Sequence, residues 1–570
     1  ALLLLAFGLR LYQVRELALP AWVDSVHHAL LVRVAIEQGG APLSLLPYLP
    51  VEQLPYHWGY HVLSAASAQI AQVGLPEAML WQGQALNALH VLACAALAAR
   101  LWRSPWAGLI AGLVVGTFSI MPAYYASWGR YTQLTGLLLL PPLAICWGAL
   151  LATRRPRHAV EVALLLAGLN LVHFRVLILA LALLAVQMLL YLLQPFFHRE
   201  EREEREGKFF LSYSVFSRSA LILPICAAAG AMLLTAPWLW LLVQRRLAPI
   251  AAGTQSLASG DAYGALSLGL LWAGHNRTLF ALALLGALWG LGRRSSPALA
   301  LVLWAGTMLT LANPQLLTYL LPLAAAPLAV SMITRGRPLL ALLAVPLLLC
   351  NPLLITLNSS WLITNDIVVI SLFVPASALI GYLAVQAGAA LQVRLPARLA
   401  ALGPRPLAAA AVFATLALAA WGAYDMREVI NTDTVLAFES DRAALAWIDN
   451  NTPADARFLI GAAPWLSTGR GVDGGWWITP LTGRWMSTPP VLYDFGAAPY
   501  VAETAARNRA VIDAAASGRA DEIEALIVRD RISHIYLSSR SGALASIFAD
   551  RSRYPALYTQ GDVTILAVRP

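Results

Sequence analysis

The chain has 570 residues, of which 59% are apolar and only 12% are charged, whereas a soluble domain carries roughly 25% charged residues. This composition excludes a water-soluble protein of this size. Residues 425–570 hold 17 acidic and 14 basic side chains and carry −3, so the total of +9 places +12 on residues 1–424. This basic excess lies between apolar segments, which indicates membrane topology and does not predict a nucleic-acid partner. We therefore predict a polytopic α-helical membrane protein.

Fourteen apolar segments are long enough to be helices that cross a hydrocarbon core of about 30 Å, and the first is expected to be the remainder of a longer membrane anchor. Arginine-rich connections recur after every second segment, and the positive-inside rule places them in the cytoplasm. A cytoplasmic N-terminus and an outer C-terminal tail require an odd number of crossings. We therefore assign the most polar candidate, residues 54–73, to a helix along the outer interface, which leaves about thirteen spans. The other candidates are the first segment and residues 83–102, 106–125, 132–151, 159–174, 176–195, 219–243, 265–291, 297–312, 315–333, 338–357, 366–390 and 406–424.

The chain changes character after residue 424. Apolar runs become short, and stretches with helical and with strand periodicity alternate. We expect a transmembrane domain over residues 1–424, with a first outer loop over about 15–82, and an extracytoplasmic α/β domain over residues 425–570. Within that domain the patterns predict helices at 440–450, 502–516 and 520–528 and strands at 457–462, 533–537 and 563–568.

Ionisable residues gather just after the first span. In a helix over residues 24–36, Asp24 and the two histidines that follow it share one face, and a second histidine pair with i, i+4 spacing lies on the interfacial segment. A carboxylate with neutral imidazoles can bind a divalent cation. Alternatively, Asp24 caps a helix and the histidines lie at the headgroup level. The candidate metal ligands beside Asp24 are His27, His28, His57 and His61.

The second outer loop reads SWGRYTQ, from Ser127 to Gln133. An arginine at the outer end of a helical bundle suits a lipid phosphate better than a metal. The sequence therefore predicts a donor-phosphate site at Arg130, Tyr131 and Gln133. A polar stretch, GTQSLASGDAYG around Asp261, is interpreted as an ordinary surface loop or as a lid over a substrate cavity.

This layout resembles the GT-C membrane glycosyltransferases, which include protein O-mannosyltransferases, aminoarabinose transferases and the catalytic subunit of oligosaccharyltransferase. Residues 24–27 are similar to the Asp-Glu-x-His of the mannosyltransferases, with Ser25 in place of the second acid, and PYHWGYHVL at 55–63 is similar to the YPPG-type start of their interfacial helix. GVDGGWWITPLTGR at 471–484 is similar to the WWDYG region of oligosaccharyltransferase, which holds an acceptor peptide. The resemblance therefore implies acceptor contacts by Asp473, Trp476 and Trp477, although the aspartate here precedes the tryptophans. The alternative for this stretch is a glycine-rich turn whose tryptophans pack against the membrane part.

The resemblance implies transfer of a sugar from a polyprenyl phosphate or diphosphate to a protein or glycan acceptor, on the outer face of the inner membrane. In this hypothesis Asp24 is the general base or a carboxylate beside a metal. The main alternative is a non-catalytic relative that serves as a structural or binding subunit, which the missing acids at Ser25 and in SWGRYTQ favour. A transporter is a third possibility, but helices broken by Gly or Pro in two matching halves are not apparent. A donor-shaped cavity lined by Asp24 and Arg130 would favour the enzyme, and a cavity filled by bulky side chains would favour the non-catalytic relative.

Overall fold

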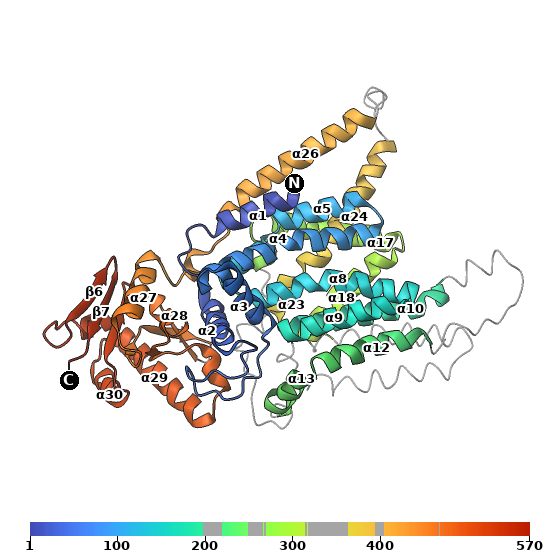
Figure 1. Ribbon diagram of the computed structural model, residues 1–570. Helices are drawn as coiled ribbons and strands as arrows, with labels where there is room; N and C mark the ends of the chain where they lie inside the picture. Colours follow the sequence, from blue (N-terminus) through green and yellow to red (C-terminus); the bar gives the residue numbers. More distant parts are fainter. Residues whose placement is uncertain are drawn as a thin grey trace, which may run out of the picture.

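The computed structural model describes residues 1–197, 219–248, 266, 269–313, 316, 363–393, 404–466 and 468–569. Long helices form a bundle on one side of the molecule, and a β-sheet with its own helices lies on the other side (Figure 1). Helices α2 (Trp22–Gln38) and α3 (Gly59–Ala71) lie between these two parts. The helix predicted at 24–36 is therefore confirmed as α2. Helix α3 falls within the predicted interfacial segment 54–73, and its place at a membrane surface stays a prediction.

The bundle is built from apolar helices that follow one another through short connections. Two of them are continued by a turn of π-helix, η1 (Val114–Phe118) after α5 and η2 (Val243–Leu247) after α13. The helices of this part are α1 (Leu2–Gln13), α4 (Leu75–Trp102), α5 (Pro105–Leu113), α6 (Ile120–Ala123), α7 (Tyr125–Trp128), α8 (Tyr131–Thr153), α9 (Pro156–Val172), α10 (Phe174–Phe197), α12 (Ser219–Leu234), α13 (Ala236–Leu242), α16 (Gly269–Trp272), α17 (Asn276–Gly292), α18 (Ser296–Ala312), α23 (Asn365–Ser371), α24 (Phe373–Val393) and α26 (Pro404–Asp425).

Within the described residues, five helices are long and apolar enough to cross a membrane, and the count becomes six if the pair 221–234 and 236–245, bent by 75°, is one span. The predicted spans 315–333 and 338–357 lie outside the described residues except for Leu316. The total of thirteen spans therefore stays a prediction. The five helices coincide with predicted spans and cover Leu75–Trp102, Tyr131–Thr153, Phe174–Leu192, Asn365–Ala390 and Ala408–Glu428.

The arginine-rich connections lie at one end of the helix pairs that they join. Arg103 separates α4 from α5, Arg154 separates α8 from α9, and Arg293 separates α17 from α18, and in each case the two helices pack against each other. Because such short turns reverse the chain, these arginines mark one end of the bundle. The start of α8 and the start of α10 lie at the other end, where α2 and the sheet are found (Figure 1). This arrangement agrees with the alternation from which the topology was predicted.

The C-terminal region begins with two turns of 3₁₀-helix, η4 (Met426–Glu428) and η5 (Thr432–Thr434), and continues as a mixed α/β structure. Its helices are α27 (Glu439–Asn451), η6 (Gly474–Trp477), α28 (Ile478–Thr482), η7 (Val491–Phe495), α29 (Ala498–Ser517), α30 (Asp521–Arg529) and α31 (Leu544–Ile547). Its strands are β1 (Arg457–Leu459), β2 (Ala462–Trp465), β3 (Thr468–Gly471), β4 (Trp485–Met486), β5 (His534–Leu537), β6 (Ala556–Gln560) and β7 (Val563–Ala567).

Five of these strands form one sheet in the order β4-β1-β5-β7-β6, in which β1 is parallel to β4 and β5 and the two pairings of β7 are antiparallel. Alternate residues of a strand point to opposite faces. Accordingly, Tyr536 packs on the side of α27, whereas Ile535 and Leu537 pack with residues of α29 and α30. Strands β2 and β3 form a separate hairpin. The helices and strands predicted in this region are confirmed as α27, α29, α30, β1, β5 and β7, whereas β2, β3, β4 and β6 were not predicted.

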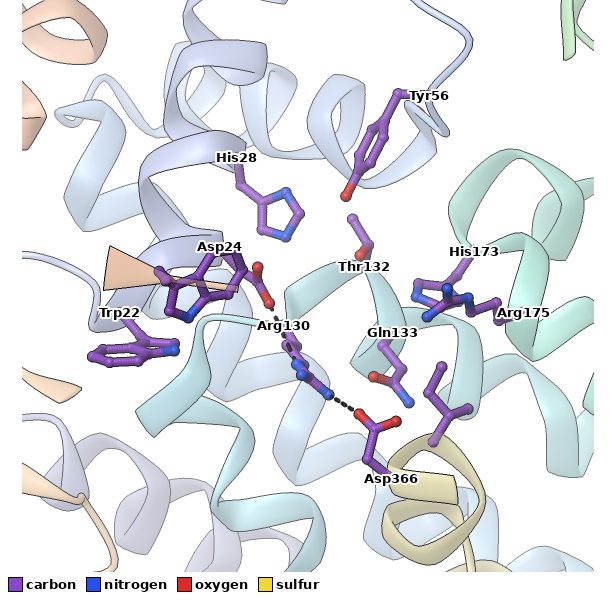
Figure 2. A pocket seen from close by; sticks show the side chains of 12 residues that line it. Trp22, Asp24, His28, Tyr56, Arg130, Thr132, Gln133, His173, Arg175 and Asp366 are labelled. Carbon is purple, nitrogen blue, oxygen red and sulfur yellow. Dashed lines mark hydrogen bonds and ion pairs between the residues drawn. The ribbon is translucent and has the colours of Figure 1, made fainter. Parts of the chain in front are cut away.

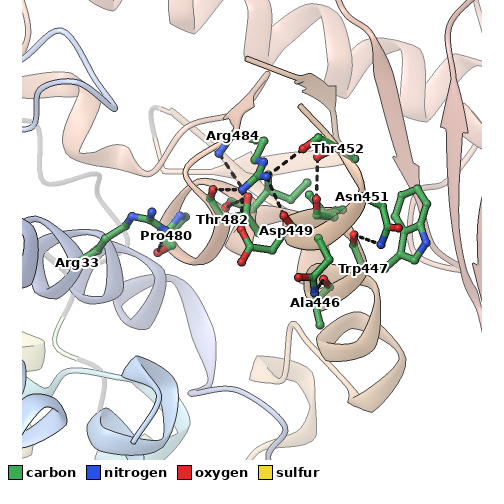
Figure 3. A network of polar contacts seen from close by, with 12 residues as sticks. Arg33, Ala446, Trp447, Asp449, Asn451, Thr452, Pro480, Thr482 and Arg484 are labelled. Atoms are coloured by element: carbon green, nitrogen blue, oxygen red, sulfur yellow. Dashed lines mark hydrogen bonds and ion pairs between the residues drawn. The ribbon is translucent and has the colours of Figure 1, made fainter. Parts of the chain in front are cut away.

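Arg484 joins the end of α27 to the segment between α28 and β4 (Figure 3). Its Nη1 donates to Asp449 Oδ1 at 2.5 Å and to the Thr482 carbonyl at 2.6 Å, and its Nη2 donates to the carbonyls of Asp449 and Thr452 at 2.9 and 3.0 Å. The carbonyls at a helix end have no partner within the helix. The guanidinium therefore satisfies two of the carbonyls at this end of α27 and attaches the helix to the segment that contacts α2.

We expect Arg484→Met to destabilise the C-terminal region by about 2 kcal/mol, because the carbonyls of the buried residues Thr452 and Thr482 lose their donor. A loss of about 2 kcal/mol increases the equilibrium constant for local opening about 30-fold. Hydrogen exchange in peptides covering 446–452 and 480–486 should accelerate accordingly. Arg519→Met, at an exposed arginine, is the matched control, and unchanged exchange in Arg484→Met would contradict the role of this network.

Candidate active site

A cavity of about 200 Å³ lies where α2 meets one end of the bundle (Figure 2). It is polar on most sides and receives side chains from segments that are far apart in the sequence. Its wall consists of Trp22, Asp24 and His28 from α2, Tyr56 from the loop before α3, Arg130, Thr132 and Gln133 from the start of α8, His173 and Arg175 from the junction of α9 and α10, Asp366 and Ile367 from α23, and Trp465 from β2.

The centre of the cavity wall is an arginine held between two carboxylates. Arg130 Nη1 donates to Asp366 Oδ2 at 2.9 Å, and Arg130 Nε lies 3.4 Å from Asp24 Oδ2. Figure 2 shows the two aspartates on either side of the guanidinium. The three side chains keep exposed fractions of 20–29%, so the cavity admits water. This arrangement places Asp24 beside the guanidinium of Arg130.

Asp24 lies in the first turn of α2, and that helix has no side-chain capping bond. The interpretation of Asp24 as a helix cap is therefore wrong, and the side chain faces the cavity instead. Burial raises the pKa of Asp24, the charge of Arg130 opposes this shift, and the charge of Asp366 adds to it. A carboxylate with a raised pKa is a better proton acceptor than an ordinary surface aspartate.

Gly129 brings the second outer loop against α2 and so determines where Arg130 lies. Its φ is +63°, which side chains rarely adopt, and a Cβ there would lie 1.9 Å from Ser25 Oγ and 2.8 Å from the Ala21 carbonyl oxygen. Ser25 is fully buried beneath this glycine. The residue that replaces the second acid of the mannosyltransferase pattern thus has a packing role, and Asp366 supplies the second carboxylate of the cavity.

We expect Gly129→Ala to displace the loop and to move Arg130 away from Asp24. A misplacement of about 1 Å reduces catalysis roughly 100-fold, and overpacking of this kind costs about 1–3 kcal/mol of stability. Gly148→Ala, in α8, is the matched control because nothing lies within 4 Å of the added Cβ. A Gly129→Ala protein with wild-type activity and melting temperature would contradict this assignment.

The predicted metal ligands do not converge on one point. His27 Nε2 accepts a hydrogen bond from the Val491 amide at 3.0 Å and its ring meets Trp476 edge-on, whereas His28 Nδ1 and His61 Nε2 lie 2.9 Å apart. His57 stacks on Tyr56. Burial lowers the pKa of His27 and of His61 to about 3 and also lowers the pKa values of the other two well below their ordinary range.

Among the residues that the structure describes, no three His, Cys, Asp or Glu side chains gather closely enough to hold a metal ion. The two cavity carboxylates, Asp24 and Asp366, instead share Arg130, whose guanidinium takes the position between them. The predicted set of Asp24 with His27, His28, His57 and His61 is therefore corrected, because these groups point to different neighbours. Among the described residues, these donors do not form a set that could hold a divalent cation.

Of the predicted donor residues, Arg130 and Gln133 line the cavity but Tyr131 does not. Tyr131 is fully buried and stacks on Tyr60, and Gly83 packs against its ring. Its place in the chain beside Arg130 therefore reflects packing between α3, α4 and α8. Phosphate binding by the other two residues stays a prediction.

The predicted acceptor residues lie in the core of the C-terminal region. Asp473, Trp476 and Trp477 have no exposed surface, and none of them lines the cavity around Asp24. Asp473 accepts hydrogen bonds from Ser538 Oγ at 2.5 Å and from the Gly475 amide at 3.0 Å. Burial raises the pKa of Asp473 to about 6. This placement matches the alternative interpretation of a glycine-rich turn with packed tryptophans.

Asp366, His173 and Trp465 were not predicted as site residues. Asp366 carried a usable signal, because an acid at the start of an apolar helix is costly to insert and such residues are usually functional. Arg175 likewise interrupts an apolar stretch between two helices. The segment around Asp261, interpreted as a loop or lid, lies outside the described residues.

Three solved structures illustrate what the chain is similar to. The apo oligosaccharyltransferase of Archaeoglobus fulgidus matches with a TM-score of 0.53 at 14% identity, over 94% of this chain and 69% of that chain. Oligosaccharyltransferase AglB from the same organism, in complex with an inhibitory peptide and a dolichol-phosphate, matches with a TM-score of 0.48 at 13% identity, over 94% and 69% of the chains. ArnT from Cupriavidus metallidurans matches with a TM-score of 0.48 at 13% identity, over 99% and 96%.

No protein-family model matches the chain, and no curated protein matches it. At 14% identity the likeness to the archaeal oligosaccharyltransferase shows a common fold. The resemblance to GT-C membrane glycosyltransferases that the sequence suggested is thus confirmed at the level of the fold.

Proposed function

We propose that the protein is a membrane glycosyltransferase that moves a sugar from a polyprenyl-phosphate or polyprenyl-diphosphate donor to an acceptor at the extracytoplasmic face of the inner membrane. The observation that carries this proposal is the Asp24–Arg130–Asp366 arrangement on the wall of a polar cavity. It lies at the bundle end opposite the arginine-rich turns, which supports an outer location. The shared fold supports the reaction class.

Asp24 is the proposed general base. An acceptor hydroxyl or amide in the cavity gives its proton to the Asp24 carboxylate as its oxygen or nitrogen bonds to the anomeric carbon of the donor sugar. The bond between that carbon and the phosphate oxygen breaks, and the lipid phosphate leaves with the electron pair. Arg130 orients Asp24, and Asp366 holds Arg130 from the other side.

Arg175 is the proposed contact for the donor phosphate, together with Gln133. It lies across the cavity from Asp24, at the start of α10 (Figure 2). The negative charge that develops on the leaving phosphate is stabilised by a positioned guanidinium. The cavity wall then carries two carboxylates and two guanidiniums, whose charges sum to zero. A bound phosphate therefore adds negative charge to a site that is otherwise neutral.

The alternative of a non-catalytic subunit has less support. A donor-shaped cavity lined by Asp24 and Arg130 was the feature expected to separate the two functions, and a cavity with this lining supports the enzyme. Charged side chains that are buried or unpaired are costly. A relative with a purely structural role would therefore not be expected to place two carboxylates and two arginines around one cavity.

The direct test is sugar transfer by the purified protein in lipid nanodiscs from a radiolabelled polyprenyl-phosphate sugar, in the presence and absence of a chelator. We expect transfer, and we expect EDTA to change the rate less than twofold, because Arg130 already lies between the two carboxylates. A rate lost in EDTA and restored by Mn²⁺ or Mg²⁺ would contradict the proposed role of Arg130. Absence of transfer with every polyprenyl-linked sugar tested would contradict the proposed function.

A further inference from the structure

A second cavity, of about 420 Å³, lies in the C-terminal region. It is formed where the linker after α26 meets β3 and the turn that follows β5. One part of its wall is apolar and includes Leu436 and Phe438, and another part is cationic and consists of Arg470 and Arg540. Such a combination suits a ligand with a charged group on an uncharged body.

Arg540 has donors that the surrounding protein leaves unused. Its Nη1 donates to the Val435 carbonyl at 3.1 Å, and its guanidinium lies 4.8 Å from the ring centre of Phe438. In the described part of the chain, its buried Nε and Nη2 have no hydrogen-bond partner. Nη2 lies 3.5 Å from Asp441 Oδ2, which is an ion pair without hydrogen-bond geometry. Arg540 also lines the cavity, so the charge of its guanidinium is available to an external oxyanion.

Arg470 points to the same ligand chemistry. Its Nη1 donates to the Gly471 carbonyl at 3.0 Å, and it forms no ion pair with any residue that the structure describes. Burial lowers the pKa of Arg470, and the charge of Arg540 lowers it further. Two guanidiniums that share one cavity repel each other, and an anion between them removes that repulsion. Asp433, at the exposed rim, is the one carboxylate of the cavity wall.

This cavity adjoins the candidate active site through two shared elements. Arg470 lies over the ring of Trp22, at 4.8 Å from the ring centre, and Trp22 lines the first cavity. The β2–β3 hairpin contributes Trp465 to the first cavity and Arg470 to the second. Trp22 and the β2–β3 hairpin therefore connect the two cavities.

We propose that the second cavity binds an oxyanion group of the acceptor, a phosphate or a carboxylate, between Arg470 and Arg540. The identification of the ligand as the acceptor rests on the transferase function proposed above. Arginine pairs bind such oxygens through charge-assisted and often bidentate hydrogen bonds. The apolar wall at Leu436 and Phe438 receives the uncharged part of the ligand.

The test uses the full chain in phosphatidylcholine nanodiscs with phenyl phosphate, phenylacetate and the neutral benzyl alcohol as probes. We expect at least one of the two anions to slow hydrogen exchange in peptides covering 432–440 and 468–473, and benzyl alcohol to leave it unchanged. A stronger effect of phenyl phosphate identifies a phosphate ligand, and a stronger effect of phenylacetate identifies a carboxylate. Absence of protection by either anion, or protection only elsewhere, would overturn the proposal.

Variants separate a specific site from general attraction of anions. We expect Arg470→Gln with Arg540→Gln to weaken anion binding about tenfold or more, and Arg509→Gln, at an exposed arginine of α29, to leave it unchanged. Thr432→Glu, at the exposed rim, adds a negative charge without disturbing the core and should weaken binding severalfold even if the arginine variant fails to fold. Wild-type affinity in a folded arginine variant, or in Thr432→Glu, would overturn the proposal.

The two proposals fail separately. Asp24→Asn should keep anion protection and lose transfer. A wild-type protein that binds the anions but transfers no sugar would contradict the proposed function and leave an anion site with another ligand. Transfer without anion protection would contradict the anion site alone.

Discussion

Asp24→Asn is expected to reduce sugar transfer by about 10²–10⁴-fold, the range that a positioned general base contributes. Asparagine has nearly the same shape as aspartate but cannot accept the proton of the acceptor. Since Asp24 contacts Arg130 at a distance of 3.4 Å, binding of donor and folding of the protein should change little. The measurement is single-turnover transfer, with donor affinity determined in parallel.

Glu37→Gln is the matched control, because Glu37 lies in the same helix but pairs with Arg33 away from the cavity. It should retain wild-type transfer. If Asp24→Asn transferred sugar at the wild-type rate, Asp24 would lose its assigned role and the catalytic interpretation would have to be abandoned for this cavity.

The pH dependence gives a second measure of the same group. Because the proposed role of Asp24 is that of a base, transfer should fall as pH drops through its pKa, which burial and the charge of Asp366 raise. Asp366→Asn removes that negative charge, so the pKa of Asp24 falls and the acidic limb of the rate profile moves to lower pH. A limb that stayed at the same pH in Asp366→Asn would show that another group titrates there.

Arg130→Ala is expected to reduce transfer by about 10²–10³-fold, comparable to the loss of one preorganised donor in an active site. Without the guanidinium, Asp24 and Asp366 face each other uncompensated, and the pKa of Asp24 rises further because the lowering effect of Arg130 is lost. The acidic limb should therefore move to higher pH, opposite to the shift in Asp366→Asn. Added guanidinium should restore part of the rate.

Arg130→Lys should remain strongly impaired, because a single ammonium cannot reproduce the planar fork that contacts two carboxylates. Arg442→Ala, which breaks an exposed pair with Glu77, is the control and should transfer normally, because exposed ion pairs contribute little. Wild-type transfer by Arg130→Lys would show that Arg130 supplies only positive charge and does not bridge the carboxylates.

Local patterns in the sequence predicted the parts of the molecule that depend on local physics. A run of apolar residues can satisfy its backbone in a membrane only as a helix, so the spans at 132–151 and 366–390 were predictable. Asp24 was predictable as a site residue because a carboxylate directly after a span faces the outer surface. The strands around Phe458, Ile535 and Ile565 were predictable because their apolar residues form short runs bounded by turn residues.

The same patterns misassigned residues whose role depends on what packs against them. Asp473, Trp476 and Trp477 have the residue types of a binding surface, yet β3, α27 and β5 cover them. The histidines of α2 have the spacing of metal ligands, yet His27 turns toward Val491 and His28 turns toward His61. Spacing within a helix determines which face a side chain occupies, and only the neighbouring segments determine what that face meets.

The sequence by itself determined the class of the protein, most of its helices and one catalytic candidate, because hydropathy and helical periodicity act over a few residues. The tertiary structure alone decided that Asp366, 236 residues beyond Arg130, completes the site. It also decided that Gly129 allows the second outer loop to pack closely against α2. Long-range pairing of this kind leaves no local signature, since it arises only when separate helices pack and bring their ends to one cavity.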